Sequence, residues 1–180
     1  MSRIGRLPVA IPAGVTVTVD KENIVTVKGP LGELKQFVNK NMTVAVEGNE
    51  VLVSRPNDDK EFKSMHGLYR TLVSNMVVGV TKGYSKTLII NGVGYKVTKQ
   101  GSKIVLGIGY SHLVEVEQPA GITFEVNGTN EIVVKGISKD AVGQCAANIK
   151  AFKVPDPYHA YGIRYSDEVI ARKEGKKAGK

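Results

Sequence analysis

The chain has 180 residues and a net charge of +8, with 25 Lys and Arg against 17 Asp and Glu. Apolar residues make up 42%, which supports a packed core and excludes a wholly disordered chain. The apolar stretches are far shorter than the roughly 18 residues of a membrane span. The basic N-terminus lacks the apolar segment of a secretory signal, and the single cysteine, Cys145, excludes an internal disulfide.

Short alternating runs fill the first part of the chain. Residues 15–19 read Val-Thr-Val-Thr-Val, which predicts a strand with one buried face. Glycine, proline and asparagine separate this run from the next ones, as expected of tight turns. The predicted strands here are 15–19, 24–28, 33–38, 42–46 and 50–54.

A helix is predicted from about Asp59 to Val78. Asp58 and Glu61 have the spacing of a capping box, and Gly79 is suited to end a helix. Apolar residues at spacings of three and four form one stripe, which we expect to cover a sheet: Phe62, Met65, Leu68, Tyr69, Leu72, Val73 and Met76.

The second part of the chain repeats the first. A shift of 80 positions aligns residues 24–48 with 104–128, and six of the 25 pairs are identical. A second helix starts at Ser138 and stops before Pro155, with Val142 and Cys145 in its apolar stripe. The predicted strands of this copy are 86–91, 95–99, 103–108, 114–118, 122–126 and 131–135.

This pattern predicts an α+β fold of two tandem homologous domains, each an antiparallel β-sheet with one packed α-helix. We place the domains at residues 1–81 and 82–154, followed by a basic tail at 155–180. Cys145 is expected to be a core residue.

Motifs for catalysis are absent from the sequence. The Gly-x-Gly pairs at 92–94 and 107–109 lack a third glycine and a following helix. His66, His112 and His159 have no partner at metal-ligand spacing. We therefore expect no enzyme, no catalytic residue, no cofactor, no metal and no small-molecule substrate.

The predicted tail combines aromatic rings with positive charge. Residues 135–180 hold ten of the basic residues and five of the acidic ones, whereas 20–80 hold eight of each. Rings at 158, 159, 161 and 165 could stack on bases and Arg164 could bind a phosphate. Two alternatives stay open: a short helix presenting the three tyrosines on one face, and a basic tail that is merely solvated.

Several stretches of this sequence resemble the family of protein six of the large ribosomal subunit, in its bacterial form. They include Ser2–Arg6, Gly92–Lys96, Gly109–His112, Val142–Gln144 and the long run Pro155–Lys177. At 159–161 this chain has His-Ala-Tyr where the family pattern reads Lys-Gly-Lys. The resemblance implies two α+β domains and binding to 23S-type ribosomal RNA near the stalk base and the translation-factor site.

We accordingly predict a structural constituent of the large ribosomal subunit, located in the cytoplasm within the ribosome. Its partners would be large-subunit rRNA and neighbouring ribosomal proteins near the stalk base, with no membrane. A protein-interaction module with a non-functional basic tail is the alternative. The predicted RNA-binding residues are Tyr95, Lys96, Ser111, His112, Lys153, Tyr158, His159, Tyr161, Arg164, Tyr165, Arg172, Lys173, Lys176 and Lys177.

Overall fold

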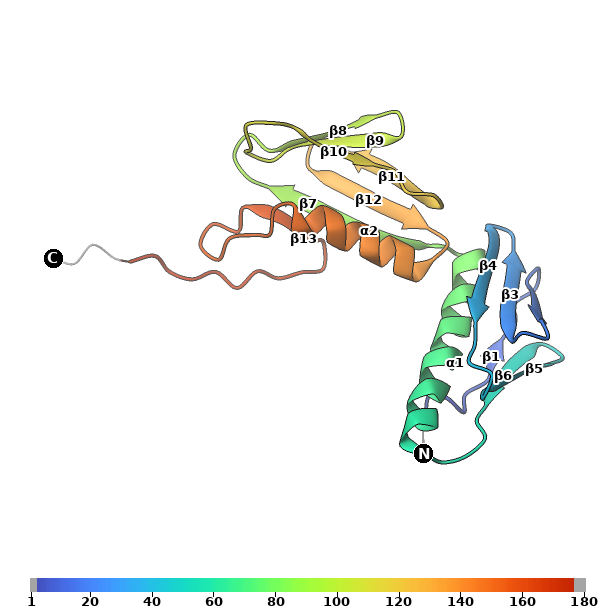
Figure 1. Ribbon diagram of the computed structural model, residues 1–180. Coiled ribbons are helices and arrows are strands. Elements are labelled where there is room, and N and C mark those ends of the chain that lie inside the picture. Colours follow the sequence, from blue (N-terminus) through green and yellow to red (C-terminus); the bar gives the residue numbers. More distant parts are fainter. Residues whose placement is uncertain (1–2, 177–180) are drawn as a thin grey trace. The chain divides into compact units, whose positions relative to one another are not determined.

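A computed structural model describes residues 3–176 of the chain. It divides into two compact units between Gly83 and Tyr84, with the segment Ile137–Lys139 grouped with the first (Figure 1). The domain boundary expected from the sequence, at 81/82, lies two residues before this division. Each unit combines antiparallel sheets with one helix, so the predicted α+β class is confirmed.

Six strands of the first unit form two antiparallel sheets instead of the single sheet expected. One has the order β1-β6-β5 and the other β2-β3-β4. All expected strands are present within two residues of their predicted ends, and the two-residue β1 is additional. The strands are β1 (Val9–Ala10), β2 (Thr16–Val19), β3 (Ile24–Gly29), β4 (Gly32–Phe37), β5 (Thr43–Glu47) and β6 (Glu50–Ser54).

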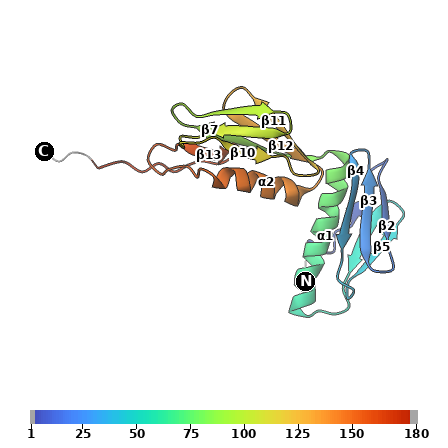
Figure 2. The ribbon, with the colours of Figure 1, turned by 45° about the horizontal axis from the view of Figure 1, so that its top comes forward.

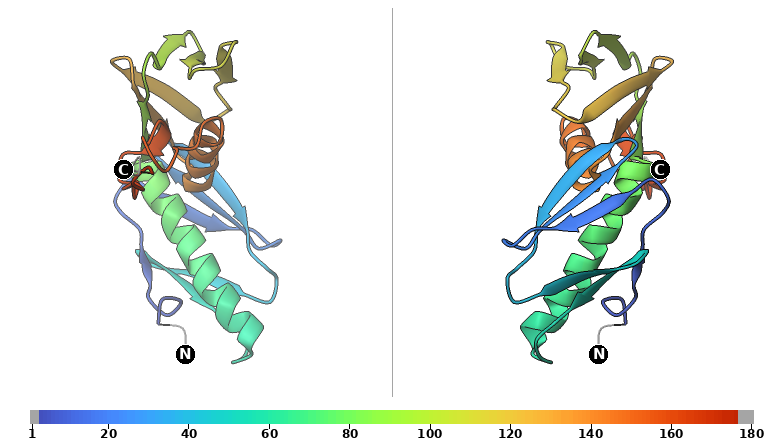
Figure 3. Two further views of the ribbon diagram at one scale, coloured as in Figure 1. Left: turned by 90° about the vertical axis from the view of Figure 1, so that its left-hand side faces the viewer. Right: turned by 90° about the vertical axis from the view of Figure 1, so that its right-hand side faces the viewer.

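Helix α1 (Lys60–Thr81) lies along both sheets of the first unit (Figure 3). Its buried face includes Val73, Met76 and Val80, which pack with the valines of β2, β3 and β6. The helix is longer than predicted because Gly79 is a buried helical residue and does not end it. The chain turns instead at Gly83, whose amide donates to the Gly79 carbonyl.

The predicted capping box at the start of α1 is wrong. Asp59 is the N-cap residue and makes no side-chain capping bond. The Asp58 carboxylate instead accepts hydrogen bonds from the Arg55 guanidinium. These hydrogen bonds, and then the positive charge of Arg55, hold the pKa of Asp58 below its ordinary value, because both favour the ionised form.

The second unit repeats this construction and adds a strand. Its two sheets have the orders β10-β9-β8 and β11-β12-β7-β13. Helix α2 (Lys139–Ala151) covers one face of the four-stranded sheet (Figure 2), and Cys145, Ala146 and Ile149 are buried in the core as expected for the helix stripe. The strands are β7 (Tyr84–Asn91), β8 (Lys96–Gln100), β9 (Lys103–Gly107), β10 (Val114–Glu117), β11 (Ile122–Asn127), β12 (Glu131–Gly136) and β13 (Gly162–Tyr165).

Strand β13 lies inside the segment expected to be a tail. It pairs antiparallel with β7, so that Ile163 faces Ile90 and Tyr165 faces Leu88. The Ile163 side chain is fully buried in the core. Residues 157–159 form turns and 162–165 form a strand, which excludes the alternative of a helix carrying Tyr158, Tyr161 and Tyr165. The first part of the predicted tail is therefore built into the second unit.

Candidate nucleic-acid interface

The loop before β13 is organised by one carboxylate. Asp156 Oδ1 accepts the backbone N–H of Tyr158 and of His159, both at 2.7 Å, and Oδ2 accepts that of Tyr161 at 3.1 Å. These backbone hydrogen bonds, led by that of His159, hold the pKa of Asp156 below its ordinary value because they favour the charged form. Asp156 thus holds the backbone that carries three of the predicted RNA-binding residues, Tyr158, His159 and Tyr161.

Two of these residues stack on each other. The His159 and Tyr161 rings have centroids 5.3 Å apart and planes inclined by 21°. Between them Ala160 turns inward in the left-handed region, with φ 59°, and is buried, while its carbonyl accepts the Asn91 amide. The inward turn of the middle residue leaves both rings exposed on the same loop, and Tyr158 is exposed beside them.

Arg164 uses part of its guanidinium within the unit. Its Nη1 donates to the carbonyl oxygens of Tyr165, Ser166 and Glu168, at 3.2, 3.5 and 3.1 Å. Three carbonyls on one nitrogen fix the turn after β13. The structure therefore gives this residue a scaffolding role alongside the phosphate contact predicted from the sequence.

Tyr165 is packed beneath two lysines. The Nζ atoms of Lys150 and Lys86 lie 4.8 and 5.4 Å from its ring centroid, within range of a cation–π interaction. Lys150 also pairs with Glu168 at 2.7 Å, and this hydrogen bond is the main reason why the pKa of Glu168 is lowered. With cations over its ring, Tyr165 is part of a packed cluster and is less available for base stacking than Tyr158 or Tyr161.

The chain after β13 supplies exposed cations. Arg172, Lys173 and Lys176 are all exposed, and the Lys173 amide donates to the Pro157 carbonyl at 2.8 Å. This bond ties the chain at residue 173 to the loop that Asp156 organises. Lys177, also predicted to bind RNA, lies outside the described residues.

A second group of predicted residues lies on loops next to β8 and β9. The Tyr95 ring lies against the backbone of Gly109, where an added Cβ would be 2.9 Å from the ring, and Gly109 has φ +79°. Lys96 is exposed at the start of β8. The closeness of ring and backbone explains why glycine, without a Cβ, stands at 109.

Tyr110 is a residue of this surface that the sequence reasoning did not select. Its hydroxyl donates to the Phe152 carbonyl at 2.7 Å, Lys153 Nζ lies 4.8 Å from its ring centroid, and its ring stacks on His112 with centroids 5.9 Å apart. It thereby joins the predicted residues His112 and Lys153, and the exposed Ser111 lies between Tyr110 and His112 in the sequence. In the sequence, the available signal was that Tyr110 directly precedes Ser111 and His112.

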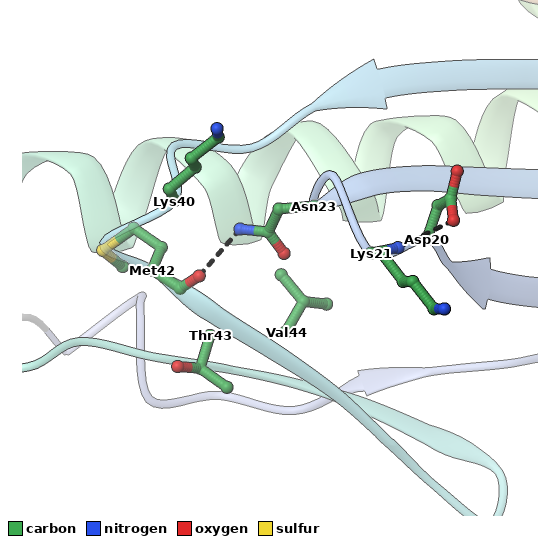
Figure 4. Close-up of a pocket in the computed structure, with 7 residues that line it drawn as sticks. All are labelled: Asp20, Lys21, Asn23, Lys40, Met42, Thr43 and Val44. Carbon is green, nitrogen blue, oxygen red and sulfur yellow. Dashed lines mark hydrogen bonds between the residues drawn. The ribbon is translucent and has the colours of Figure 1, made fainter.

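The first unit contains a cavity that lies outside the predicted residues. A cavity of about 330 Å³ lies beside Asn23, but the Asn23 amide already donates to the carbonyls of Met42 and Asn39, and the lysines at 21 and 40 point to different sides (Figure 4). Within residues 3–176, no cluster of three or more His, Cys, Asp or Glu side chains is placed to hold a metal. No helix in that range has the length and apolar character to cross a membrane.

His66 has a structural role. It is 5% exposed, and its Nε2 lies 2.7 Å from the Val53 carbonyl, so Nε2–H is the donor there. The other nitrogen, Nδ1, then accepts from Arg55 Nη1 at 3.2 Å. Both ring nitrogens are satisfied inside the first unit, which leaves this histidine out of any candidate site.

The comparison with known proteins decides the family. The family model described as ribosomal protein L6 matches residues 11–83 and again 91–166. The chain belongs to the ribosomal protein L6 family. The two matches correspond to the two units, and the second runs through β13 to Ser166.

Relatives match over nearly their full length. A protein of Clostridium perfringens (strain SM101) is 57% identical, covering 98% of each chain. One of Caldicellulosiruptor saccharolyticus is 56% identical over 100% of this chain and 98% of its own, and one of Clostridium acetobutylicum is 55% identical. All three are named large ribosomal subunit protein uL6.

Membership in the L6 family confirms the resemblance seen in the sequence. It makes the chain a ribosomal protein, a structural constituent of the large subunit that is found in the cytoplasm as part of the ribosome, and not an enzyme. The RNA-binding residues described above remain predictions.

Proposed function

We propose that the chain binds 23S-type ribosomal RNA through its second unit and stabilises the folded RNA. Support comes mainly from one observation: the second unit exposes rings and cations together, on loops that hydrogen bonds hold in place. Tyr158, His159 and Tyr161 lie on the Asp156 loop, and Arg172 and Lys173 follow on a segment tied to it. Single-stranded and irregular RNA is recognised by this combination of stacking and charge.

Charge neutralisation supplies most of the binding free energy in this mechanism. Each phosphate that a Lys or Arg neutralises releases counterions, so the logarithm of affinity falls with the logarithm of salt by roughly 0.7–0.9 per contact. The residues proposed for these contacts are Lys96, Lys153, Arg164, Arg172, Lys173, Lys176 and Lys177. Ser111, His112 and Tyr95 would contribute polar and stacking contacts on the neighbouring loops.

We also propose that the protein lies near the stalk base and the translation-factor site, with its first unit against neighbouring ribosomal proteins. This placement is supported by the resemblance to the L6 family and by the even charge of residues 20–80, with eight basic and eight acidic residues. Crosslinking the protein in intact large subunits and mapping the RNA and protein adducts tests it. Adducts confined to a distant RNA domain would contradict it.

Salt-dependent binding tests the RNA mechanism. The full chain is titrated with deproteinised bacterial large-subunit rRNA at several salt concentrations. The variant R172Q/K173Q/K176Q/K177Q should bind more weakly, with a salt slope about 3 units shallower. Because Ile163 and β13 belong to the fold, substitutions are preferable to a truncation at residue 154.

A matched variant removes the same charge from the first unit. Lys21, Lys28, Lys40 and Lys60 are exposed there, and K21Q/K28Q/K40Q/K60Q should leave the slope nearly unchanged. Equal slopes for the two variants would contradict binding centred on the second unit. A wild-type affinity that does not depend on salt would favour the alternative of a protein-interaction module.

A further inference from the structure

We infer that the Asp156 loop is a preformed stacking site for one unpaired nucleobase. The inference rests on the proposed rRNA binding and names the ligand of one part of it. His159 and Tyr161 already form a stack of two rings, and the His159 side chain is 71% exposed. One ring face of His159 is covered by Tyr161, so a base that stacks on its other face would extend the stack to three rings.

Preorganisation distinguishes this loop from a flexible aromatic segment. Asp156 holds the backbone of residues 158, 159 and 161, and the Ala160 amide donates to the Asp156 carbonyl at 3.1 Å. Asn91, at the end of β7, anchors the Ala160 carbonyl. The backbone that carries the two rings is therefore held in place before any ligand arrives, which lowers the entropy lost on binding.

Charge around the loop favours a nucleotide over an apolar peptide as the occupant. Lys173 is joined to Pro157 through its backbone, and Arg172 precedes it, so cations flank the stacked rings. The Asp156 carboxylate lies 3.9 Å from His159 Nδ1 and is already bonded to three amides. A base on the rings would place its own phosphates toward the exposed cations, as in other single-strand binding sites.

Asp156 is a positioning residue in this proposal. It touches no base but fixes the two rings that do. Replacing Asp156 should therefore weaken RNA binding only because the two rings lose their position. Double-mutant cycles separate these cases, because residues that act through one contact have non-additive effects.

The test uses the full chain and deproteinised bacterial large-subunit rRNA. His159→Ala and Tyr161→Ala should each weaken binding about tenfold, the loss expected for one base–aromatic stack, with the salt slope unchanged. Phe37→Ala removes an exposed ring of the first unit (53% exposed) and should leave affinity within twofold of wild type. Thermal unfolding of every variant checks that the fold is intact.

Three further variants sharpen the result. Asp156→Ala should weaken binding about as much as His159→Ala, and the double variant D156A/H159A should bind no more weakly than either. The ring-to-cation variant H159K/Y161K should show a steeper salt slope, by up to about 2 units, because it exchanges stacking for phosphate contacts.

The outcomes separate this inference from the proposed function. If wild type binds rRNA with a strong salt dependence but His159→Ala and Tyr161→Ala bind equally well, the stacking site is wrong and rRNA binding stands. If wild type itself shows no salt-dependent affinity, the proposed function fails. Additive losses in D156A/H159A would contradict the positioning role of Asp156.

Discussion

The two units share one arrangement of strands and differ in what is added to it. The order β5-β6-β1 in the first corresponds to β11-β12-β7 in the second, and β2-β3-β4 corresponds to β8-β9-β10. Within residues 3–176 a further strand is added in the second unit alone, where β13 pairs with the other side of β7. The predicted interface residues before, within and after β13 thus belong to an addition, and the duplicated sheet serves as its support.

In the first unit, the strand that corresponds to β7 is β1, and its surroundings differ from those of β7. Strand β1 has two residues where β7 has eight. The chain just before β1 is held by Arg70, which donates to the Leu7 and Pro8 carbonyls at 3.0 and 3.1 Å. Arg70 is therefore engaged in closing the fold of the first unit, while the second unit carries exposed rings and cations around β13.

Among the substitutions that test this difference between the units, Gly162→Ala is expected to lower the stability of the protein most. Gly162 has φ +149°, and an added Cβ would lie 2.7 Å from the Lys153 carbonyl oxygen and from the Pro155 nitrogen. These backbone atoms cannot move away easily, so the substitution should lower the free energy of unfolding by about 4 kcal/mol. Hydrogen exchange read by mass spectrometry should show lost protection in β13 and β7.

Gly175→Ala is the control for this substitution, because nothing lies within 4 Å of the added Cβ. It should change the free energy of unfolding by less than about 0.5 kcal/mol. If Gly162→Ala behaved like the control, β13 would not be an integral strand of the second unit.

A smaller loss is expected in the first unit from His66→Ala. The change leaves the Val53 carbonyl and Arg55 Nη1 without their partner and opens a cavity, which together should cost about 3 kcal/mol. His112→Ala, on an exposed ring of the second unit, should leave stability unchanged. Chemical denaturation of both variants checks the difference, and equal stabilities would show that His66 does not hold the first unit together.

Asn23 should contribute about 2 kcal/mol to the first unit. It has φ 61°, and its amide donates to the Asn39 and Met42 carbonyls at 3.0 and 2.8 Å. Asn23→Ala loses both bonds and strains the backbone, whereas Asn23→Gly loses the bonds but tolerates the positive φ. Denaturation should therefore rank wild type above Asn23→Gly and Asn23→Gly above Asn23→Ala; the reverse order of the two variants would contradict this assignment.

The smallest effect concerns pH and the Asp156 loop. Because the pKa of Asp156 in the folded protein lies below its ordinary value, its stabilising bonds are fully present above about pH 4 and are lost as the pH falls through the lowered pKa. The three hydrogen bonds of the Asp156 carboxylate should thus be retained between pH 5 and 8. A carbon-13 NMR titration of the Asp156 carboxyl, identified by its disappearance in D156N, should give a midpoint below the ordinary value of an aspartate, and a midpoint at or above that value would contradict the proposed bonds.

Much of the fold could be predicted because it depends on local patterns. The alternation in Val15–Val19 and the spacing of Val73 and Met76 record which side of each element is buried. The strand β13 was missed because Gly-Ile-Arg-Tyr carries too little alternation to stand out among charged and aromatic residues. Its pairing with β7, more than 70 residues earlier, is a non-local contact that no local pattern encodes.

The candidate site was predictable in composition but not in arrangement. The residue types at 158–161 and 172–176 indicated stacking and charge. Their sequence did not indicate that Asp156 would bind three backbone amides, or that Tyr165 would lie under two lysines. Tyr110 was overlooked because only the fold brings its ring beside Lys153.

The duplicated α+β architecture, the family and the concentration of positive charge near the C-terminal end could be predicted without coordinates. Each is encoded by residue periodicity, identity or count along the chain. The packing of the folded chain was needed to show which of the aromatic and basic side chains are committed to the fold and which are exposed. That division depends on hydrogen bonds and ring contacts between segments far apart in the chain, such as Lys86 with Tyr165, and they form only when the strands and helix are assembled.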